Sequence, residues 1–132
     1  MPHYNVVGAL VMREGKVLAA RRGASKHEYV AHKFEFVGGK IEPGETEEEA
    51  LMRELREELC VSARILGHFR TVEHAYPDFS VRLAVYAVEF LSEFHRIEHE
   101  EFRWIPVAQL DPDEWAPADA PIVLALRRGE TV

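Results

Sequence analysis

Cysteine, positive charge and long apolar runs are all scarce in this sequence of 132 residues. Cys60 is the only cysteine, so an intramolecular disulfide is excluded, which suits a reducing compartment. The longest apolar run near the start, "VVGALVM" at residues 6–12, is far too short to span a bilayer. It also lacks the basic leader and the cleavage site of a signal peptide. We therefore expect a soluble, cytoplasmic protein without a membrane partner.

Positive charge is in deficit, because 16 basic residues face 23 acidic residues and leave a net charge of −7. A field of this sign repels phosphate backbones, so we expect no nucleic acid polymer as a partner. An anionic ligand would have to be bound locally, by a few arginines or through a cation. The length and the 47% hydrophobic content predict one domain with one core over residues 1–132.

The apolar pattern predicts an α+β fold, in which a mixed sheet is covered by two helices. Turn residues separate the strands: Gly15 lies in the polar connection "REGK", and a Tyr-Pro-Asp turn lies within residues 75–79. Residues 23–33 show no clean period and are expected to form an irregular loop. Strands are expected at residues 6–12, 16–22, 34–36, 61–73, 80–91 and 102–107.

Two segments carry helix signals. The first helix is expected to begin near residue 46, after a Pro-Gly turn, and to bury leucines at positions 51, 55 and 59. The last helix is expected over residues 119–128, with Asp119 at its N-cap and Pro121 in its first turn. An N-cap aspartate contributes about 1 kcal/mol, so Asp119 needs no further role to be explained.

The stretch "RELREEL" at residues 53–59 places three like charges on one helix face. Glu54, Glu57 and Glu58 lie three and four residues apart, and like charges at that spacing repel each other. Several converging carboxylates are the ligand set of a hard cation such as Mg²⁺. Salt bridges to Arg53 and Arg56 on a surface helix would explain the same letters equally well. The three acids alone leave both interpretations open.

The surrounding residues decide the interpretation. From Gly39 the chain reads G-x5-E-x7-R-E-L-x-E-E-x-C-V through residue 61, which resembles the Nudix box. Every specified position matches except one, where Cys60 replaces a glycine. The segments "FEFVGGKIEPGE", "EHEEFRW" and "WAPADAPIVLAL" also resemble MutT-type nucleoside triphosphate pyrophosphohydrolases, in matching order and spacing. The resemblance covers most of the chain and includes the 8-oxo-dGTP diphosphatases and CTP pyrophosphohydrolases of that subfamily.

The resemblance implies the Nudix fold, a mixed sheet sandwiched between helices (α/β/α), and a metal site. Arg53 would orient a glutamate through an ion pair, and Glu54 or Glu98 would be the general base. Alternatives remain for three of these features. Glu98 could belong to a plain acidic loop, and the glycine pair at residues 38 and 39 could form a tight turn. Glu45 could be either an outer metal ligand or an ordinary acid in the first helical turn. The ligands of Mg²⁺, or alternatively Mn²⁺, would be Gly38, Glu54, Glu57, Glu58 and Glu98.

The resemblance also implies substrate contacts. Arg22 and Lys40 are candidates for the phosphates, although each also fits a solvated surface cation. Phe36 is a candidate for substrate binding within "FEFVGGKIEPGE". Asp119 would read the base, by accepting a hydrogen bond from an exocyclic amine or, when protonated, by donating one to a carbonyl. The seven histidines show no zinc-type spacing.

The implied function is Mg²⁺-dependent hydrolysis of a nucleoside triphosphate to a monophosphate and pyrophosphate. The candidate substrates are 8-oxo-dGTP, in nucleotide-pool sanitation, and the cytidine nucleotides CTP, dCTP and 5-methyl-dCTP. A catalytically silent nucleotide-binding domain is the alternative of another class, although such domains usually lose a box carboxylate and this chain keeps them all. The sequence leaves monomer and homodimer open. In the family, the glycine at the position of Cys60 ends the helix, where a left-handed residue is usual. A cysteine at positive φ would cost about 1 kcal/mol there, so we expect a slightly altered helix end, with metal binding preserved because no ligand changes.

Overall fold

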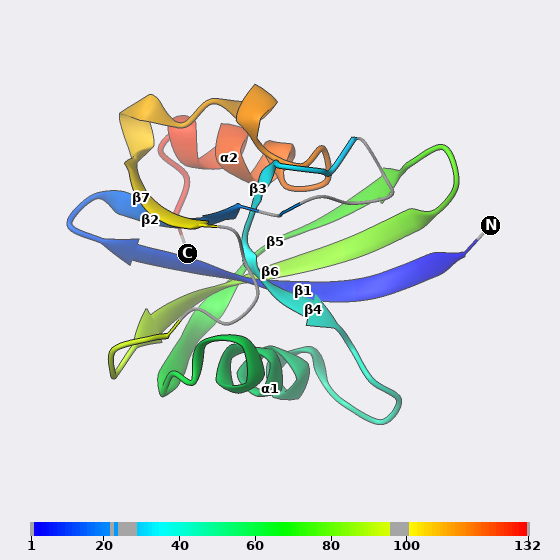
Figure 1. Ribbon diagram of the computed structural model, residues 1–132, viewed down its shortest axis with the longest axis horizontal. Coiled ribbons are helices and arrows are strands. Elements are labelled where there is room, and N and C mark those ends of the chain that lie inside the picture. Colours follow the sequence, from blue (N-terminus) through cyan, green and yellow to red (C-terminus); the bar gives the residue numbers. More distant parts are fainter. Residues whose placement is uncertain (1, 22, 24–28, 96–100, 132) are drawn as a thin grey trace.

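A seven-stranded mixed sheet with a helix on each face forms the computed structural model, which describes residues 2–21, 23, 29–95 and 101–131 (Figure 1). The strand order is β3-β2-β1-β6-β5, with β4 paired to β1 and β7 paired to β2. The elements are β1 (His3–Arg13), β2 (Lys16–Arg21), β3 (Phe34–Glu35), β4 (Val37–Lys40), α1 (Glu47–Leu59), β5 (Ala63–Ala75), β6 (Ser80–Phe90), β7 (Glu101–Pro106), the 3₁₀ turns η1 (Val107–Gln109) and η2 (Pro112–Glu114), and α2 (Ala120–Arg127). The predicted α+β class and α/β/α layering are confirmed.

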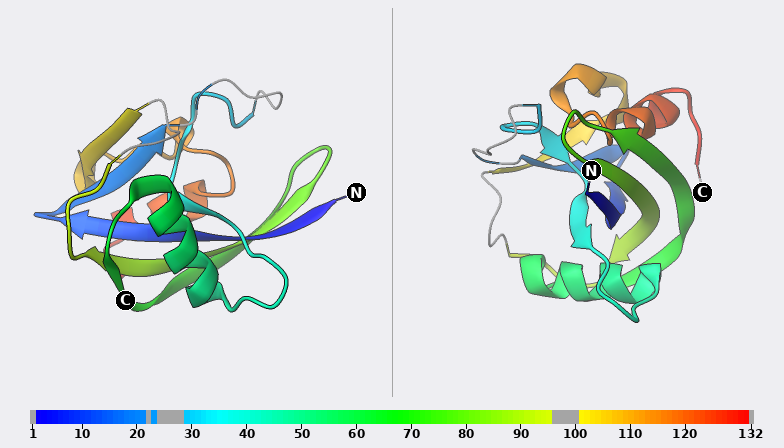
Figure 2. Two further views of the ribbon diagram at one scale, coloured as in Figure 1. Left: turned by 60° about the horizontal axis from the view of Figure 1, so that its bottom comes forward. Right: turned by 90° about the vertical axis from the view of Figure 1, so that its right-hand side faces the viewer.

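Helix α1 and helix α2 lie on opposite sides of the strands (Figure 2, right). Two main cores result, because each face of the sheet is apolar and each is covered by a helix. The core under α1 contains its three leucines and the inward residues of β1 and β6. The core under α2 is built around Trp115, Ile122 and Val123. Among the residues that the structure describes, no helix has the length and apolarity that crossing a membrane requires.

Strand β1 organises the sheet because it pairs with three other strands. It runs parallel to β6 from His3 to Val11, while its outer flank pairs antiparallel first with β4 and then with β2. The hairpin into β2 turns through Glu14 and Gly15, both at positive φ (52° and 74°), a conformation that favours glycine. The predicted hairpin is confirmed, and so are the predicted strands, with ends shifted by up to three residues.

A tight turn was the alternative explanation for the glycine pair of residues 38 and 39, and this alternative is wrong. Both residues lie in strand β4, where Gly38 pairs with Gly8 and Gly39 pairs with Val7. A Cβ atom on Gly38 would lie 1.9 Å from the carbonyl oxygen of Val7. Glycine is therefore required here by close packing against β1 rather than by a change of chain direction.

Helix α1 follows the sequence prediction closely. Thr46 is the N-cap, and its hydroxyl accepts a hydrogen bond from the Glu49 amide. The Glu49 carboxylate in turn accepts a hydrogen bond from the Thr46 amide, which completes a capping box. Leu51, Leu55 and Leu59 are fully buried. The helix ends at Cys60, an exposed residue with φ 51° and ψ 38°. Cys60 therefore adopts the left-handed conformation that is usual for the family glycine at this position.

Candidate active site

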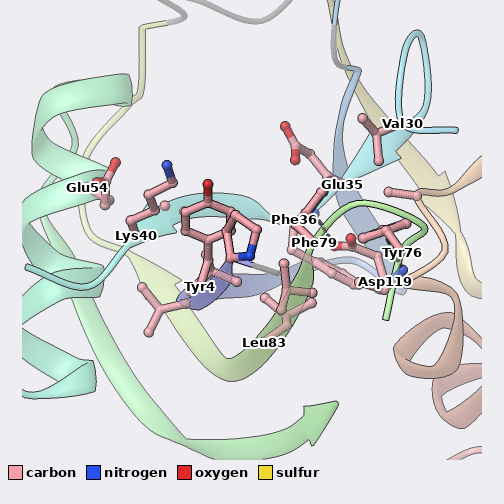
Figure 3. A pocket seen from close by; sticks show the side chains of 18 of the residues that line it. Tyr4, Val30, Glu35, Phe36, Lys40, Glu54, Tyr76, Phe79, Leu83 and Asp119 are labelled. Carbon is pink, nitrogen blue, oxygen red and sulfur yellow. Dashed lines mark hydrogen bonds between the residues drawn. The ribbon is translucent and has the colours of Figure 1, made fainter. Parts of the chain in front are cut away.

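A cavity of about 800 Å³ lies against β1, β4 and β6, between helix α1 and the segment that leads into α2. Its two ends differ in chemistry (Figure 3). At one end, which we call the acidic end, lie Gly38, Gly39, Lys40, Glu54 and Glu58. At the other, which we call the aromatic end, lie Tyr76, Phe79 and Asp119. The volume falls within the range that suits a small-molecule ligand.

The acidic end takes its carboxylates from one face of α1. Glu54 and Glu58 are one helical turn apart, and both line the cavity. The side chain of Glu54 is only 14% exposed. Burial raises the pKa of the Glu54 carboxyl, against the opposing effect of the neighbouring Arg53 guanidinium. Glu54 is therefore a carboxylate whose affinity for a proton or a cation is higher than that of an exposed glutamate.

Arg53 connects this carboxylate to its surroundings. Its Nε and Nη2 donate to both carboxylate oxygens of Glu45, at 2.7 and 3.0 Å. Its Nη1 donates to Glu54 at 2.9 Å and to Glu57 at 3.2 Å. Its Nη2 also donates to the carbonyl oxygen of Lys40 at 3.0 Å, so the guanidinium ties α1 to strand β4. These bonds raise the pKa of Arg53.

Part of the salt-bridge alternative from the sequence is correct. Arg53 forms ion pairs with four acids, Glu42, Glu45, Glu54 and Glu57, and its hydrogen bonds lower the pKa of the Glu45 carboxyl. Arg56 makes no ion pair within the part of the chain that the structure describes. Arg53 thus bonds to Glu54 from outside the cavity, and the wall formed by Glu54 and Glu58 still faces the open space. The orienting role expected for Arg53 stays a prediction.

Glycine at position 39 makes room for the Glu54 carboxylate. A Cβ atom there would lie 2.5 Å from Cδ of Glu54 and 2.6 Å from each of its oxygens. The two consecutive glycines therefore have separate reasons: Gly38 allows β4 to approach β1, and Gly39 allows the helix carboxylate to rest against β4. The sequence pattern gave the position of both without distinguishing these reasons.

The aromatic end is built from the turn between β5 and β6 and from the segment before α2. The Tyr76 ring stacks on Tyr29, with centroids 4.8 Å apart and planes 12° apart, and contacts Phe79 at 4.8 Å. Its Oη accepts a hydrogen bond of 3.1 Å from the Ala118 amide. Because Tyr76 is 6% exposed, this bond secures the segment that carries Asp119.

Asp119 occupies the N-cap position of α2, as predicted, but its side chain does not cap the helix. No side-chain bond joins it to the first turn of α2. Its Oδ1 instead accepts a hydrogen bond of 3.1 Å from the Phe36 amide, across 83 residues of sequence. The Phe36 ring itself packs on Trp115 at 4.7 Å. The expected capping by this carboxylate is therefore wrong, because the backbone amide of Phe36, which lies between β3 and β4, competes for it.

Comparison with known proteins identifies the family and the fold. The family described as "NUDIX domain" matches residues 1–126. The chain belongs to the Nudix family. It is 34% identical to an 8-oxo-dGTP diphosphatase of Escherichia coli over 92% of this chain and 94% of that protein. It is 33% identical to the CTP pyrophosphohydrolase of the same organism, over 95% and 92%.

The structural comparison agrees. The solution structure of the E. coli ORF135 protein matches with a TM-score of 0.82 at 33% identity, covering 97% of this chain and 91% of that one. A MutT Nudix hydrolase from methicillin-resistant Staphylococcus aureus 252 matches with a TM-score of 0.73 at 36% identity, covering 98% and 99%. The predicted Nudix fold and the prediction of a Nudix hydrolase are confirmed.

Within the Nudix box the three helix glutamates are not equivalent. Glu54 and Glu58 line the cavity, whereas Glu57 does not and is 60% exposed. Among the described residues, no three His, Cys, Asp or Glu side chains converge into a preformed metal centre. Glu54 and Glu58 still suit a hard cation, because their carboxylates come from one helix turn and face strand β4, whose glycines leave space beside them. A cation would draw Glu54 and Glu58 together rather than enter a finished cage.

Four polar or aromatic residues are among the lining residues of the Nudix cavity that sequence reasoning missed. Glu35, Tyr4, Tyr76 and Phe79 all line it, and Glu35 directs its carboxylate toward the space between the two ends (Figure 3). A signal existed for Glu35, because it is the polar member of the alternating triplet "FEF". For Tyr76 and Phe79 the signal was their position around the Pro77 turn.

Two predicted site residues, Arg22 and Glu98, lie outside the residues that the structure describes. Lys40 is exposed at the acidic end, with its ammonium over the ring of Tyr4. Phe36 lines the cavity but is 4% exposed, so its amide bond to Asp119 is its direct contribution to the aromatic end. The functional roles expected for these residues remain predictions.

Proposed function

We propose that this Nudix hydrolase cleaves a nucleoside triphosphate to a nucleoside monophosphate and pyrophosphate. The observation that carries the proposal is the polarity of the cavity, with two helix carboxylates at one end and a buried carboxylate framed by aromatic rings at the other. A nucleotide has a matching arrangement, because charged phosphates lie at one of its ends and a flat heteroaromatic base lies at the other. The acidic end would hold the phosphates through a cation, and the aromatic end the base.

Hydrolases of this family generally need a divalent metal ion, and we infer that Mg²⁺ serves here. Glu54, Glu57 and Glu58 would hold it, together with the Gly38 carbonyl and Glu98. A bound divalent cation offsets the negative charge of the phosphates and lowers the pKa of a coordinated water. Without it, a chain with net charge −7 would repel the triphosphate.

Glu54 is the proposed general base among the described residues. Its pKa is raised by burial, so its carboxylate accepts a proton more readily than an exposed glutamate. It would remove a proton from water while the water oxygen attacks phosphorus in line and the bond to the leaving phosphate oxygen breaks. Arg53 would hold Glu54 in orientation through the bond of 2.9 Å, and Lys40 would contact the phosphates.

The base is proposed to be 8-oxoguanine. The Asp119 carboxylate is 7% exposed and only accepts hydrogen bonds when ionised. A guanine-type edge offers it two adjacent donors, the ring N–H and the exocyclic amine. A relative with 34% identity is named as an 8-oxo-dGTP diphosphatase, which supports the same choice. These two observations make 8-oxo-dGTP the first candidate substrate.

A cytidine nucleotide is the second candidate. Its exocyclic amine is a single donor that the Asp119 carboxylate could accept, and a relative with 33% identity is named as a CTP pyrophosphohydrolase. The neighbouring ring nitrogen of cytosine is an acceptor, however, and would face the same carboxylate unfavourably. Protonation or reorientation of one partner would be needed, so we place this candidate second.

Steady-state kinetics with 8-oxo-dGTP, dGTP, CTP, dCTP and 5-methyl-dCTP at equal Mg²⁺ tests the substrate. We expect the highest kcat/KM for 8-oxo-dGTP. Asp119→Asn should change the ratio of kcat/KM between guanine and cytosine nucleotides by about tenfold or more, since one acceptor becomes a donor. An unchanged ratio would remove Asp119 from base recognition.

The metal assignment needs its own test. Glu54→Gln, Glu57→Gln and Glu58→Gln should each lower kcat/KM by about 100-fold or more. Glu48→Gln is the matched control, because Glu48 is an exposed glutamate of the same helix that does not line the cavity. Calorimetry with Mg²⁺ and a non-hydrolysable triphosphate should show binding in the control and little in the Glu58 variant. Equal loss in all four variants would point to helix destabilisation instead.

A further inference from the structure

Lys40 stands out because its ammonium is held by a ring and not by a carboxylate. Its Nζ lies 4.2 Å from the centroid of the Tyr4 ring, within the range of a cation–π interaction. Within the described part of the chain, Lys40 makes no ion pair with an acidic side chain. Both Tyr4 and Lys40 line the cavity, and the close view places the Tyr4 ring beside the Lys40 ammonium at the acidic end (Figure 3).

The rest of Lys40 is already fixed by its neighbours. Its Cα pairs with Val6 of β1, and its carbonyl oxygen accepts a bond of 3.0 Å from Arg53. Only the flexible four-carbon stem is left to be ordered, and fixing such a stem carries a large entropic cost. The ring of Tyr4 reduces that cost before any ligand arrives.

The Tyr4 ring is itself anchored. Its residue pairs with Val81 across the parallel β1–β6 ladder, and the ring meets Phe79 edge to face at 5.8 Å. A ring holds an ammonium without neutralising its charge. A carboxylate in the same place would hold it as well, but would compete with an incoming phosphate for the same N–H donors.

We propose that Tyr4 is a positioning residue, which holds the Lys40 ammonium at the acidic end of the cavity for the terminal phosphates of the substrate. The inference rests on the proposed function, because it assigns phosphate binding to Lys40. It adds Tyr4, which acts through Lys40 and does not touch the reacting atoms. A ligand without a base, inorganic pyrophosphate, should therefore depend on Tyr4 as strongly as a whole nucleotide does.

The test compares Tyr4→Leu, Tyr4→Phe, Lys40→Met and the double variant Tyr4→Leu/Lys40→Met. Calorimetry with pyrophosphate and Mg²⁺ measures binding without any turnover, and kinetics measures KM and kcat for the triphosphate that is hydrolysed. We expect Tyr4→Leu to weaken pyrophosphate binding and to raise KM by about two- to fivefold, which is the size of an exposed cation–π interaction. Tyr4→Phe, which keeps the ring, should restore both values to near wild type.

The double variant decides how Tyr4 acts. In the Lys40→Met background, Tyr4→Leu should have no further effect on either value, because the ring then has no ammonium to hold. An effect of the same size in that background would overturn the inference and make Tyr4 a direct substrate contact. A rise in KM without weaker pyrophosphate binding would also overturn it, by placing Tyr4 against the base.

Failure of the proposed function has a different signature. If Lys40→Met binds pyrophosphate as the wild type does, the role of Tyr4 is overturned while hydrolysis of the triphosphate still stands. If the wild type hydrolyses no triphosphate but binds pyrophosphate in a manner that depends on Tyr4 and Lys40, the proposed reaction fails and the positioning role stands. If the wild type binds no pyrophosphate with Mg²⁺, both fail.

Discussion

Replacing Gly39 by alanine tests whether the position of the Glu54 carboxylate controls activity. The added Cβ would lie 2.5 Å from Cδ of Glu54, and ordinary contact begins near 3.4 Å, so the carboxylate must move by about 1 Å. The backbone of Gly39 is not at positive φ, so alanine adds no backbone strain. A misplacement of about 1 Å in a reacting group costs about 100-fold in rate, and we expect that loss in kcat/KM.

The same substitution should leave the fold intact, because the atoms in the way belong to the end of a flexible side chain. Gly38→Ala provides the contrast, since its Cβ would lie 1.9 Å from the backbone carbonyl oxygen of Val7. We expect Gly38→Ala to lose β4 pairing and to unfold at a markedly lower temperature. Thermal melts by circular dichroism, together with kcat/KM, measure both variants. A Gly39→Ala protein that is fully active, or that is as unstable as Gly38→Ala, would refute the reasoning.

Three further variants test the fold around the site. Cys60→Gly should raise the free energy of unfolding by about 0.5–1 kcal/mol in urea titrations, because residue 60 adopts φ 51°, which favours glycine. A decrease would show that contacts of the thiol stabilise the fold. Burial alone would raise the pKa of the Glu47 carboxyl. The hydrogen bonds that Glu47 accepts from Tyr86 and Arg82 instead lower this pKa below its ordinary value of 4.5. The stability that ionised Glu47 adds is therefore present at neutral pH and is lost as the pH falls through the lowered pKa. Glu47→Gln should lower the free energy of unfolding by about 1–2 kcal/mol at pH 7 and by little in acid. A cost that does not change with pH would contradict this. Tyr76→Phe should cost about 1–3 kcal/mol, because the Ala118 amide loses its acceptor, and an unchanged melting temperature would exclude that bond as a support.

Local rules predicted helix α1 almost completely. Its cap at Thr46 and its leucine stripe each depend on residues within a few positions of one another. Such signals are readable from sequence because the partners are near neighbours. The same is true of the β1–β2 hairpin, where two residues set the turn.

The partners of Asp119 and of the glycine pair were not readable in this way. The Asp119 carboxylate bonds to an amide 83 residues earlier, and Gly38 is packed against a strand that begins near the start of the chain. A helix N-cap and a tight turn were the local explanations for these residues, and a distant competitor displaced each of them. The family resemblance singled out these residues, but it contains no information about which neighbour each one contacts.

The arrangement of charge explains how α1 can stack acids along one face and remain folded. The Arg53 guanidinium bonds to Glu45, Glu54 and Glu57, and it is anchored to the backbone of Lys40 behind the cavity wall. Its positive charge balances the carboxylates for folding without occupying the cavity side of Glu54. The neighbouring acid Glu57 and burial still raise the pKa of Glu54, so the internal arginine leaves part of the negative charge uncompensated. A cation arriving with an anionic substrate would neutralise this uncompensated negative charge. The same helix face could therefore be stable alone and still bind a cation with its substrate.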